Sequence, residues 1–271
     1  MTGRLFDLPV TMVSEWIFNS YAITADDALV VVDPGLPSVA SQMLEALSRS
    51  EGAGPADIST VVCTHGHSDH VGGVSTLLSG CDAAVHLPAR CESYLAGELP
   101  RAFPVIESSV RFMPVYREQP FSLRGLREFL GQARSIGWGA GNQMTVDFDP
   151  AGFLSDGDPV PSAPNWTTVA APGHTDDSTC LHHRESSTLI SGDAVVTQDG
   201  TAWFNPEYVD YADALETAAR LKELDVRHLL PGHGMPIHGA DIWDQAKHPG
   251  DRPGGKGLLA RCSRRFGHWH H

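Results

Sequence analysis

Long apolar runs, paired cysteines and positive charge are all scarce in this chain of 271 residues. No apolar stretch approaches the roughly 18 residues that a membrane helix needs, and the first residues lack the long apolar centre of a signal peptide. The five cysteines show no Cys-x-x-Cys spacing, which is typical of unpaired thiols in a reducing compartment. We therefore expect a cytoplasmic protein without a membrane span.

Basic residues are outnumbered, with 19 lysines and arginines against 33 aspartates and glutamates and a net charge of -14. Residues 249–271 carry five basic residues against Asp251 alone, so this tail has a charge of +4 and residues 1–248 carry -18. An acidic surface repels polyanions. A nucleic-acid partner is therefore disfavoured, and we expect a small-molecule substrate.

The length of the chain and its alternation of strand and helix patterns predict one α/β domain over residues 1–248. The basic tail, residues 249–271, contains glycine and proline, and a poorly ordered terminus is its simplest interpretation. Ser38 is expected to cap one helix, and Asp210 or Asp213 to begin a later one. Apolar, β-branched segments predict strands over 16–24, 28–32, 60–63, 83–87, 166–171, 188–191 and 228–230.

Four potential metal ligands, His65, His67, Asp69 and His70, fall within six consecutive positions. They follow an apolar predicted strand and precede a predicted helix over residues 71–78, so they lie at the C-terminal end of a strand. A glycine between the first two histidines permits a tight turn from which both can converge on one ion. Asp69 and His70 point from the helix start towards a second position, so one short loop can supply two metals.

Three further candidate ligands, His174, Asp193 and His233, each come directly after a glycine and after a predicted strand. The ends of these strands can meet at one edge of a sheet, where the three side chains join the first histidine run. A histidine-rich surface loop without a metal is the alternative for the first run. The density of ligand types favours a metal site instead.

The motifs stand in the order that the metallo-β-lactamase superfamily has: Val32-Asp33-Pro34-Gly35, the run from His65 to His70, then His174, Asp193 and His233. The chain resembles this superfamily over about residues 10–240. The resemblance implies an α/β fold, the αββα sandwich of the metallo-β-lactamase type, with the metals at one edge. It also implies a helical or loop insertion near the active site, at about residues 88–164 of this chain.

The resemblance assigns seven side chains to two divalent metal ions. His65, His67 and His174 would bind the first ion, Asp69, His70 and His233 the second, and Asp193 would bridge the two. Asp33 is expected to lie behind the ligands, where it orients the histidine loop. Zinc suits an imidazole-rich site, and iron and manganese accept the same mixture of ligands.

The implied chemistry is hydrolysis. Two divalent ions roughly 3.5 to 4 Å apart can lower the pKa of a shared water to near neutrality, which creates a hydroxide nucleophile. Asp69 is expected to assist proton transfer, and Asp193 to hold both ions. The sequence has no Gly-x-Ser-x-Gly motif to offer a covalent nucleophile. The predicted function is a metal-dependent hydrolase of a small ester, lactone, thioester or related substrate.

Aromatic residues near the predicted insertion are candidates for the substrate pocket. Insertions at this point overhang the metals in the superfamily, so Phe112, Tyr116 and Trp138 are candidate residues of a pocket or of a homodimer interface. Trp203 and Tyr208 follow the last predicted aspartate ligand and are candidates for a second pocket wall. The spacing of these aromatic residues carries no chemical signature of a substrate.

Departures from known patterns narrow the function. Class B1 β-lactamases have a cysteine where this chain has Asp193, and glyoxalase II has a helical extension that has no equivalent after His233. Acyl-homoserine lactonases carry a catalytic tyrosine where this chain has Val196, and Tyr208 is a candidate substitute. Two alternatives stay open: a mononuclear-iron oxidoreductase of the persulfide dioxygenase type, and a hydrolase of small phosphodiesters.

Overall fold

The fold is known from a computed structural model, which describes residues 2–25, 28–49, 54–101, 105–136 and 143–269. Among these residues, strands pair into a first sheet of seven in the order of the chain. These strands are β1 (Thr2–Arg4), β2 (Val10–Glu15), β3 (Phe18–Ala25), β4 (Ala28–Val32), β5 (Ile58–Val62), β6 (Ala84–Pro88) and β7 (Gly152–Leu154). Strands β1 to β4 pair antiparallel with one another, and β4 to β7 pair parallel with one another.

Six described strands form the second sheet. In spatial order they are β15 (Ile237–His238), β14 (His228–Pro231), β11 (Thr188–Gly192), β10 (Thr179–His183), β9 (Ala163–Ala170) and β8 (Pro159–Val160). The short hairpin of β12 (Val195–Gln198) and β13 (Thr201–Phe204) stands apart from both sheets. Only the pair β11 and β14 is parallel in this sheet as described, so it brings two loops to the same edge.

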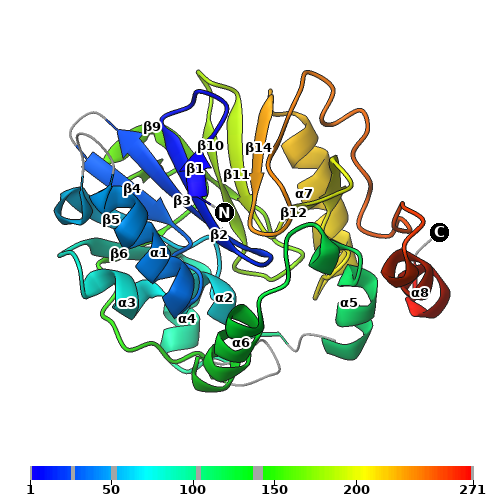
Figure 1. The fold of residues 1–271 in the computed structure, drawn as a ribbon, viewed down its shortest axis with the longest axis horizontal. Helices are drawn as coiled ribbons and strands as arrows, with labels where there is room; N and C mark the ends of the chain where they lie inside the picture. The colour runs from blue at the N-terminus through cyan, green and yellow to red at the C-terminus, as the bar shows by residue number, and fades with distance from the viewer. Residues whose placement is uncertain (1, 26–27, 50–53, 102–104, 137–142, 270–271) are drawn as a thin grey trace.

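The helices lie outside the two sheets, which pack face to face (Figure 1). Helices α1 and α3 cover the first sheet, and α7 covers the second. The described helices are α1 (Pro37–Ser48), α2 (Ser68–Val71), α3 (Val74–Leu78), α4 (Arg90–Leu95), α5 (Val105–Phe112), α6 (Leu123–Ser135), α7 (Tyr211–Lys222) and α8 (Leu258–Phe266), with 3-10 turns at η1 (Pro55–Asp57) and η2 (Val115–Arg117). The predicted αββα sandwich is confirmed. None of the described helices has the length and apolar character that a membrane crossing requires.

The pleat of the central strands explains why they are buried on both faces. In β4, Val30 and Val32 contact the residues between the two sheets, whereas Leu29 and Val31 contact the residues under α1. Successive side chains of a strand point to opposite faces, so an uninterrupted apolar run fits a strand covered on both sides. The apolar run of β4 therefore encodes its central place in the sandwich.

Two helix boundaries differ from the prediction. Leu36 rather than Ser38 precedes α1, because Pro37 occupies the first helical position, where its missing N–H costs nothing. The single helix predicted over 71–78 is instead two short helices, α2 and α3. They are separated at Gly73, where an added Cβ would lie 2.6 Å from the carbonyl oxygen of Pro34. Close backbone packing thus interrupts this helix.

The segment 88–164 adds a strand and helices to the domain, and part of the tail forms a helix. Strand β7 extends the first sheet, and Ser122 caps α6, because its Oγ accepts from the N–H of Gly125 at 3.1 Å. Helix α8 forms within the tail and packs on α5, where the Ser263 hydroxyl donates to the carbonyl of Arg111 at 3.1 Å. The expectation of a poorly ordered terminus is therefore wrong for residues 258–266.

Asp210 caps α7, and its replacement separates capping from ion pairing. Its carboxylate accepts from the backbone N–H groups of Ala212 and Asp213, and it also lies 3.0 Å from the guanidinium of Arg101. We expect Asp210→Ala to lower the free energy of unfolding by about 1 kcal/mol, because the cap is lost. Asp210→Asn should keep most of that stability, since asparagine also caps. Urea denaturation of both variants measures this; an equal loss in both would assign the effect to the Arg101 ion pair.

Candidate metal centre

The predicted ligands lie together at one edge of the sandwich. His65 and His67 follow β5, and Asp69 and His70 lie in the first turn of the short helix α2. The remaining three come from the second sheet: His174 from the β9–β10 loop, Asp193 directly after β11, and His233 after β14. All seven side chains are buried. The sandwich thus brings residues separated by up to about 170 positions into one cluster.

Two triads in this cluster have the geometry of metal sites. The ligand atoms of His65, His67 and His174 all lie within 4.8 Å of one another, and the same holds for Asp69, His70 and His233. In the first triad, His174 Nε2 lies 3.2 Å from His67 Nδ1. In the second, His233 Nε2 lies 3.3 Å from Asp69 Oδ2. These are the two groups of three that the sequence resemblance implied.

Asp193 lies between the two triads. Its Oδ2 is 3.5 Å from His174 Nε2 in the first triad and 3.1 Å from His233 Nε2 in the second. Its Oδ1 is 3.3 Å from His70 Nε2. Asp193, His70 and His65 form a third group whose ligand atoms lie within 4.8 Å of one another. One carboxylate therefore faces both triads, which is the position that a bridging ligand requires.

Asp33 supports the histidine loop from behind. Its Oδ1 accepts from the backbone N–H of Thr64 at 2.7 Å, and its Oδ2 accepts from the Thr64 hydroxyl at 2.8 Å. The same Oδ2 lies 2.9 Å from His70 Nδ1. Asp33 is buried and belongs to neither triad. It fixes both the loop backbone and the orientation of one imidazole, as carboxylates behind metal-binding histidines commonly do.

Other imidazoles are oriented by backbone carbonyls. His174 donates from Nδ1 to the carbonyl of Glu207 at 2.7 Å, and His233 donates from Nδ1 to the carbonyl of Ile17 at 2.8 Å. Each bond leaves Nε2 pointing into the cluster. Asp177 also holds the loop, because its Oδ2 accepts from the N–H of Gly66 at 2.7 Å. The sequence did not mark Asp177, since nothing in its local pattern distinguishes it from a surface aspartate.

The protonation of the first triad fits metal binding. Burial, followed by the neighbouring imidazoles, lowers the pKa of His65 well below its usual value and the pKa of His67 to about 3. Both rings are therefore neutral, which is the form that binds a metal. The buried Nε2 of His65 has no hydrogen-bond partner among the described residues. A bound cation would satisfy this nitrogen and balance the adjacent carboxylates.

A cavity of about 200 Å³ opens over the cluster. Five of its lining residues are candidate ligands: His67, Asp69, His174 and His233 from the two triads, and Asp193. The remaining wall is largely apolar and aromatic, and is formed by Trp16, Ile17, Phe18, Phe112, Tyr116, Leu126, Phe129 and Glu207. The β2–β3 turn, helices α5 and α6, the 3-10 turn η2 and the loop before α7 supply these residues. Burial raises the pKa of Glu207 to about 8, so this carboxyl adds little charge to the wall near neutral pH.

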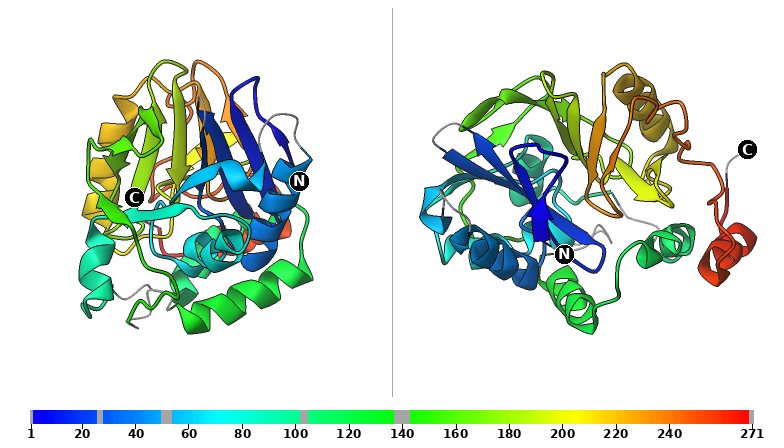
Figure 2. Two further views of the ribbon diagram at one scale, coloured as in Figure 1. Left: turned by 90° about the vertical axis from the view of Figure 1, so that its left-hand side faces the viewer. Right: turned by 45° about the horizontal axis from the view of Figure 1, so that its top comes forward.

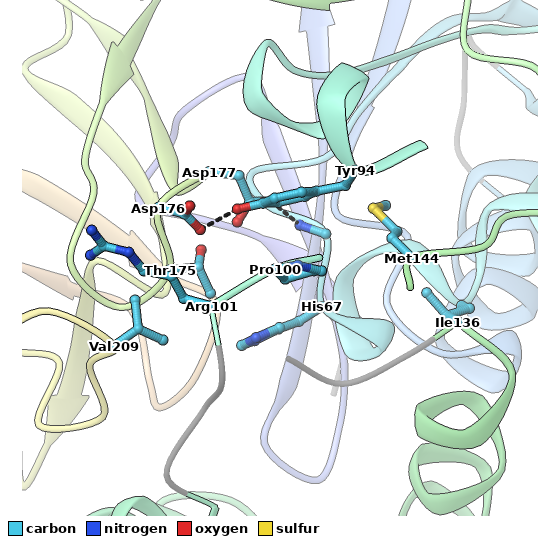
Figure 3. Close-up of a pocket in the computed structure, with 11 residues that line it drawn as sticks. His67, Tyr94, Pro100, Arg101, Ile136, Met144, Thr175, Asp176, Asp177 and Val209 are labelled. Atoms are coloured by element: carbon cyan, nitrogen blue, oxygen red, sulfur yellow. Dashed lines mark hydrogen bonds between the residues drawn. The ribbon is translucent and has the colours of Figure 1, made fainter. Parts of the chain in front are cut away.

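A smaller cleft of about 30 Å³ lies on the other side of His67 (Figure 3). Tyr94 and His67 stand on opposite sides of it, and the Tyr94 hydroxyl donates to Asp176. Arg101 and Met144 line the cleft at its opposite ends. His67 thus lines both this cleft and the aromatic cavity.

The predicted pocket residues divide into three groups. Tyr116 and Phe112 line the cavity. Trp203 does not: it is fully buried in the core, where it stacks on Trp269 and donates to the carbonyl of His248 at 3.0 Å. Tyr208 packs under the guanidinium of Arg111, 4.2 Å from ring centre to Cζ, and is absent from the described cavity wall. Trp138 lies outside the described residues.

Trp16, Phe18 and Phe129 are cavity residues that sequence reasoning missed. The first two lie at a strand turn that pattern alone assigns to the core, and no spacing connects them with the ligand motifs. The pairing of β2 with β3 beside the His233 loop brings Trp16 and Phe18 to the ligand cluster. The Asn19 side chain makes that connection by donating to the carbonyls of Pro231 and Gly234.

A family comparison agrees with this geometry. The family model described as the metallo-beta-lactamase superfamily matches residues 15–233. The chain belongs to the metallo-β-lactamase superfamily. The match includes every candidate ligand, and the chain is accordingly a metallo-hydrolase of this superfamily.

Individual relatives cover most of the chain. The protein called probable metallo-hydrolase YflN from Bacillus subtilis is 25% identical over 79% of this chain and 78% of its own length. Acyl-coenzyme A thioesterase MBLAC2 from Gallus gallus is 30% identical over 79% of this chain and 72% of its own length. The solved structure of TTHA1623 in a di-iron-bound form has a TM-score of 0.53 and 20% identity, and covers 84% of this chain and 92% of that chain.

Asp33→Asn tests how the buried support acts on the cluster. The amide oxygen of asparagine can still accept from Thr64, but its NH₂ group cannot accept from His70 Nδ1. We expect the affinity of the second triad for zinc to fall about 10- to 100-fold, with the first triad less affected. Competition with a chromophoric chelator should then resolve two zinc-binding steps of different affinity. Unchanged affinity at both steps would contradict a role for Asp33.

Proposed function

We propose that this protein is a dinuclear metal-dependent thioester hydrolase whose cavity accepts an acyl chain. One observation carries the proposal: members of two complete triads, with Asp193 between them, form the floor of a cavity that has an aromatic wall. The similarity to a protein named acyl-coenzyme A thioesterase supports the thioester class. The substrate is thus a small amphiphilic molecule rather than a polymer.

The metal assignment follows from the two triads. His65, His67 and His174 would hold one ion, Asp69, His70 and His233 the other, and Asp193 both. Five imidazoles among seven ligands favour zinc, and iron is the second choice. When bound, such a pair of ions supplies an acidified water as the nucleophile and polarises the substrate carbonyl.

The chain's own residues orient the substrate and manage protons. Asp69 belongs to the second triad and also lines the cavity, so its carboxylate can accept a proton beside the scissile bond. Burial raises the pKa of Tyr116, so its hydroxyl keeps its proton and can donate a hydrogen bond to the substrate. The aromatic wall excludes water from the acyl chain.

The nature of the leaving group favours a thioester over a lactone. Alkoxide leaving groups need a proton donor, whereas a thiol has a pKa of about 8.5 and leaves readily as a thiolate. The position of the lactonase tyrosine is Val196, which is buried in the core. Tyr208, the candidate substitute, packs against Arg111 instead. A site without that donor suits the better leaving group.

The two alternatives have less support. A mononuclear-iron oxidoreductase would leave the triad of Asp69, His70 and His233 without a role. For a phosphodiesterase, the described cavity wall contains neither lysine nor arginine to hold a phosphate oxygen. A cytoplasmic location and a homodimer remain predictions of the sequence.

Asp193→Ala tests the dinuclear mechanism. In zinc-loaded protein assayed by thiol release from acyl-coenzyme A, we expect kcat to fall about 100-fold or more, because both metal positions lose a ligand. Metal content should fall below two ions per chain. The exposed Asp244→Ala serves as the control, since this side chain belongs to none of the ligand groups. Retention of wild-type turnover by Asp193→Ala would contradict the mechanism.

Phe129 and Leu126 should set the preferred acyl length. Phe129→Ala enlarges the cavity, so kcat/KM should shift towards longer acyl chains, and Leu126→Trp should shift it towards shorter ones by filling the cavity. One methylene in an apolar pocket is worth about 10-fold or more. Phe153→Ala is the matched control, since Phe153 is half-buried and lies outside the cavity wall. A length profile unchanged in both cavity variants would place the acyl chain elsewhere.

A further inference from the structure

Exposed large apolar side chains are concentrated in two short parts of the molecule. Eight such side chains occur among the described residues, and seven of them lie within 99–130 or 258–266. The exceptional one is Leu215 on α7, at 39% exposure. The other seven are Leu99, Ile106, Phe121, Leu123, Leu130, Leu258 and Phe266, with exposures from 49% to 83%. A concentration of this kind marks a surface that binds something.

The same two parts of the chain carry positive charge in an otherwise acidic protein. Residues 99–136 contain six arginines against three acidic residues, a net charge of +3. Residues 249–271 carry +4. Because the net charge of the whole chain is -14, the residues outside these two segments carry -21. Among the described residues, no ion pair involves the exposed side chains of Arg117, Arg127, Arg134, Lys256, Arg261 or Arg265.

Helices α6, α5 and α8 follow one another along one side of the molecule, as Figure 1 and the right-hand view of Figure 2 both show. Helix α8 packs on α5 through the Ser263 hydroxyl and the carbonyl of Arg111. Helix α6 is joined to α1, where the backbone N–H of Ser38 donates to Glu128 at 2.9 Å. We call the exposed apolar and basic side chains of these three helices and of Phe121 the basic apolar face.

The basic apolar face is continuous with the cavity over the metal cluster. The ring of Phe121 is 62% exposed and stands edge-on to Trp16, with 5.1 Å between ring centres. Trp16 in turn lines the cavity. Helix α6 has the same arrangement, because Leu126 and Phe129 line the cavity while Leu123 and Leu130 are exposed. An apolar chain therefore has a short route from this face to the metals.

We propose that the basic apolar face binds the surface of an anionic lipid bilayer. Exposed leucine and phenylalanine side chains can enter the boundary between headgroups and acyl chains, while neighbouring arginines contact lipid phosphates. The acidic remainder of the protein is repelled by the same surface, which fixes the orientation with the cavity mouth towards the lipid. The route of an acyl substrate past Phe121 and Trp16 rests on the proposed thioester hydrolysis; the lipid binding does not.

Charge distinguishes a lipid surface from a second copy of this chain. In a symmetric dimer the same face would meet itself, and the unpaired arginines of both copies would be brought together. Like charges in a partly buried interface are unfavourable. An anionic bilayer supplies phosphates for these arginines and an apolar layer for the leucines at the same time. It therefore satisfies both features of the face.

Vesicle sedimentation with the full zinc-loaded chain tests the inference. Vesicles of phosphatidylcholine with phosphatidylserine should bind the protein, vesicles of phosphatidylcholine alone should bind it much less, and added salt should weaken binding. Arg127→Gln combined with Arg134→Gln should weaken partitioning by about fivefold for each arginine. The control is Arg184→Gln with Arg227→Gln, two exposed arginines outside the face; this pair should bind as the wild type does.

The apolar contribution is tested separately. Leu123→Ser combined with Leu130→Ser should reduce partitioning by about tenfold or more, because two leucines leave the bilayer boundary. Leu215→Ser, the matched exposed leucine on α7, should leave partitioning unchanged. The inference would be overturned if Leu215→Ser reduced partitioning as much as the Leu123→Ser and Leu130→Ser double variant does. Equal binding of the wild type to both kinds of vesicle would also overturn it. So would a wild-type dimer that the Leu123→Ser and Leu130→Ser changes convert to a monomer, since the face would then be a subunit interface.

Hydrolysis measured in the same samples separates this inference from the proposed function. A short, water-soluble acyl thioester reports turnover without any vesicle. Absent vesicle binding with normal hydrolysis would reject the lipid-binding face alone. Vesicle binding without hydrolysis of any thioester would reject the proposed function alone.

Discussion

The face-to-face packing of two sheets is the constraint on which the rest of this structure depends. Apolar side chains such as Val32 and Leu181 fill the space between the sheets and fix their relative position. The strand ends at one edge then lie close together, although they are distant in sequence. Histidine and aspartate side chains at these ends are buried with little freedom to move away. A cluster of imidazoles and carboxylates at this density is stable only if hydrogen bonds and a cation satisfy it.

Hydrogen bonds behind the cluster convert proximity into a defined geometry. Asp33 and Asp177 hold the histidine loop from two sides, and backbone carbonyls orient His174 and His233. In each triad, the imidazole nitrogens that face the cluster then lie within 4.8 Å of the other ligand atoms. These contacts are made while the chain folds, so the ligands need little rearrangement when a metal enters. The fold therefore preorganises the ligands for metal binding.

The cavity wall combines this rigid edge with helices that lie outside the two sheets. Helices α5 and α6 lie over the ligand cluster and supply Phe112, Leu126 and Phe129 from one face, while Ile106, Leu123 and Leu130 are exposed. The same helices thus connect the reaction centre with the molecular surface. A site of this kind keeps its chemistry in the sheets and its selectivity in the helices, which is common where loops and insertions surround a rigid scaffold.

The sequence by itself indicated the sandwich fold and the seven clustered residues, because its ligand motifs follow predicted buried strands and stand in the order of the superfamily that the chain resembles. It did not determine the cavity wall. Trp203 and Tyr208 follow Asp193 closely in sequence, yet one stacks in the core and the other packs on Arg111. Trp16, Phe129 and Asp177 are distant from the motifs, yet they lie at the site. Tertiary structure decided these positions because an aromatic side chain packs wherever neighbouring elements leave space, and local sequence does not record where distant elements meet.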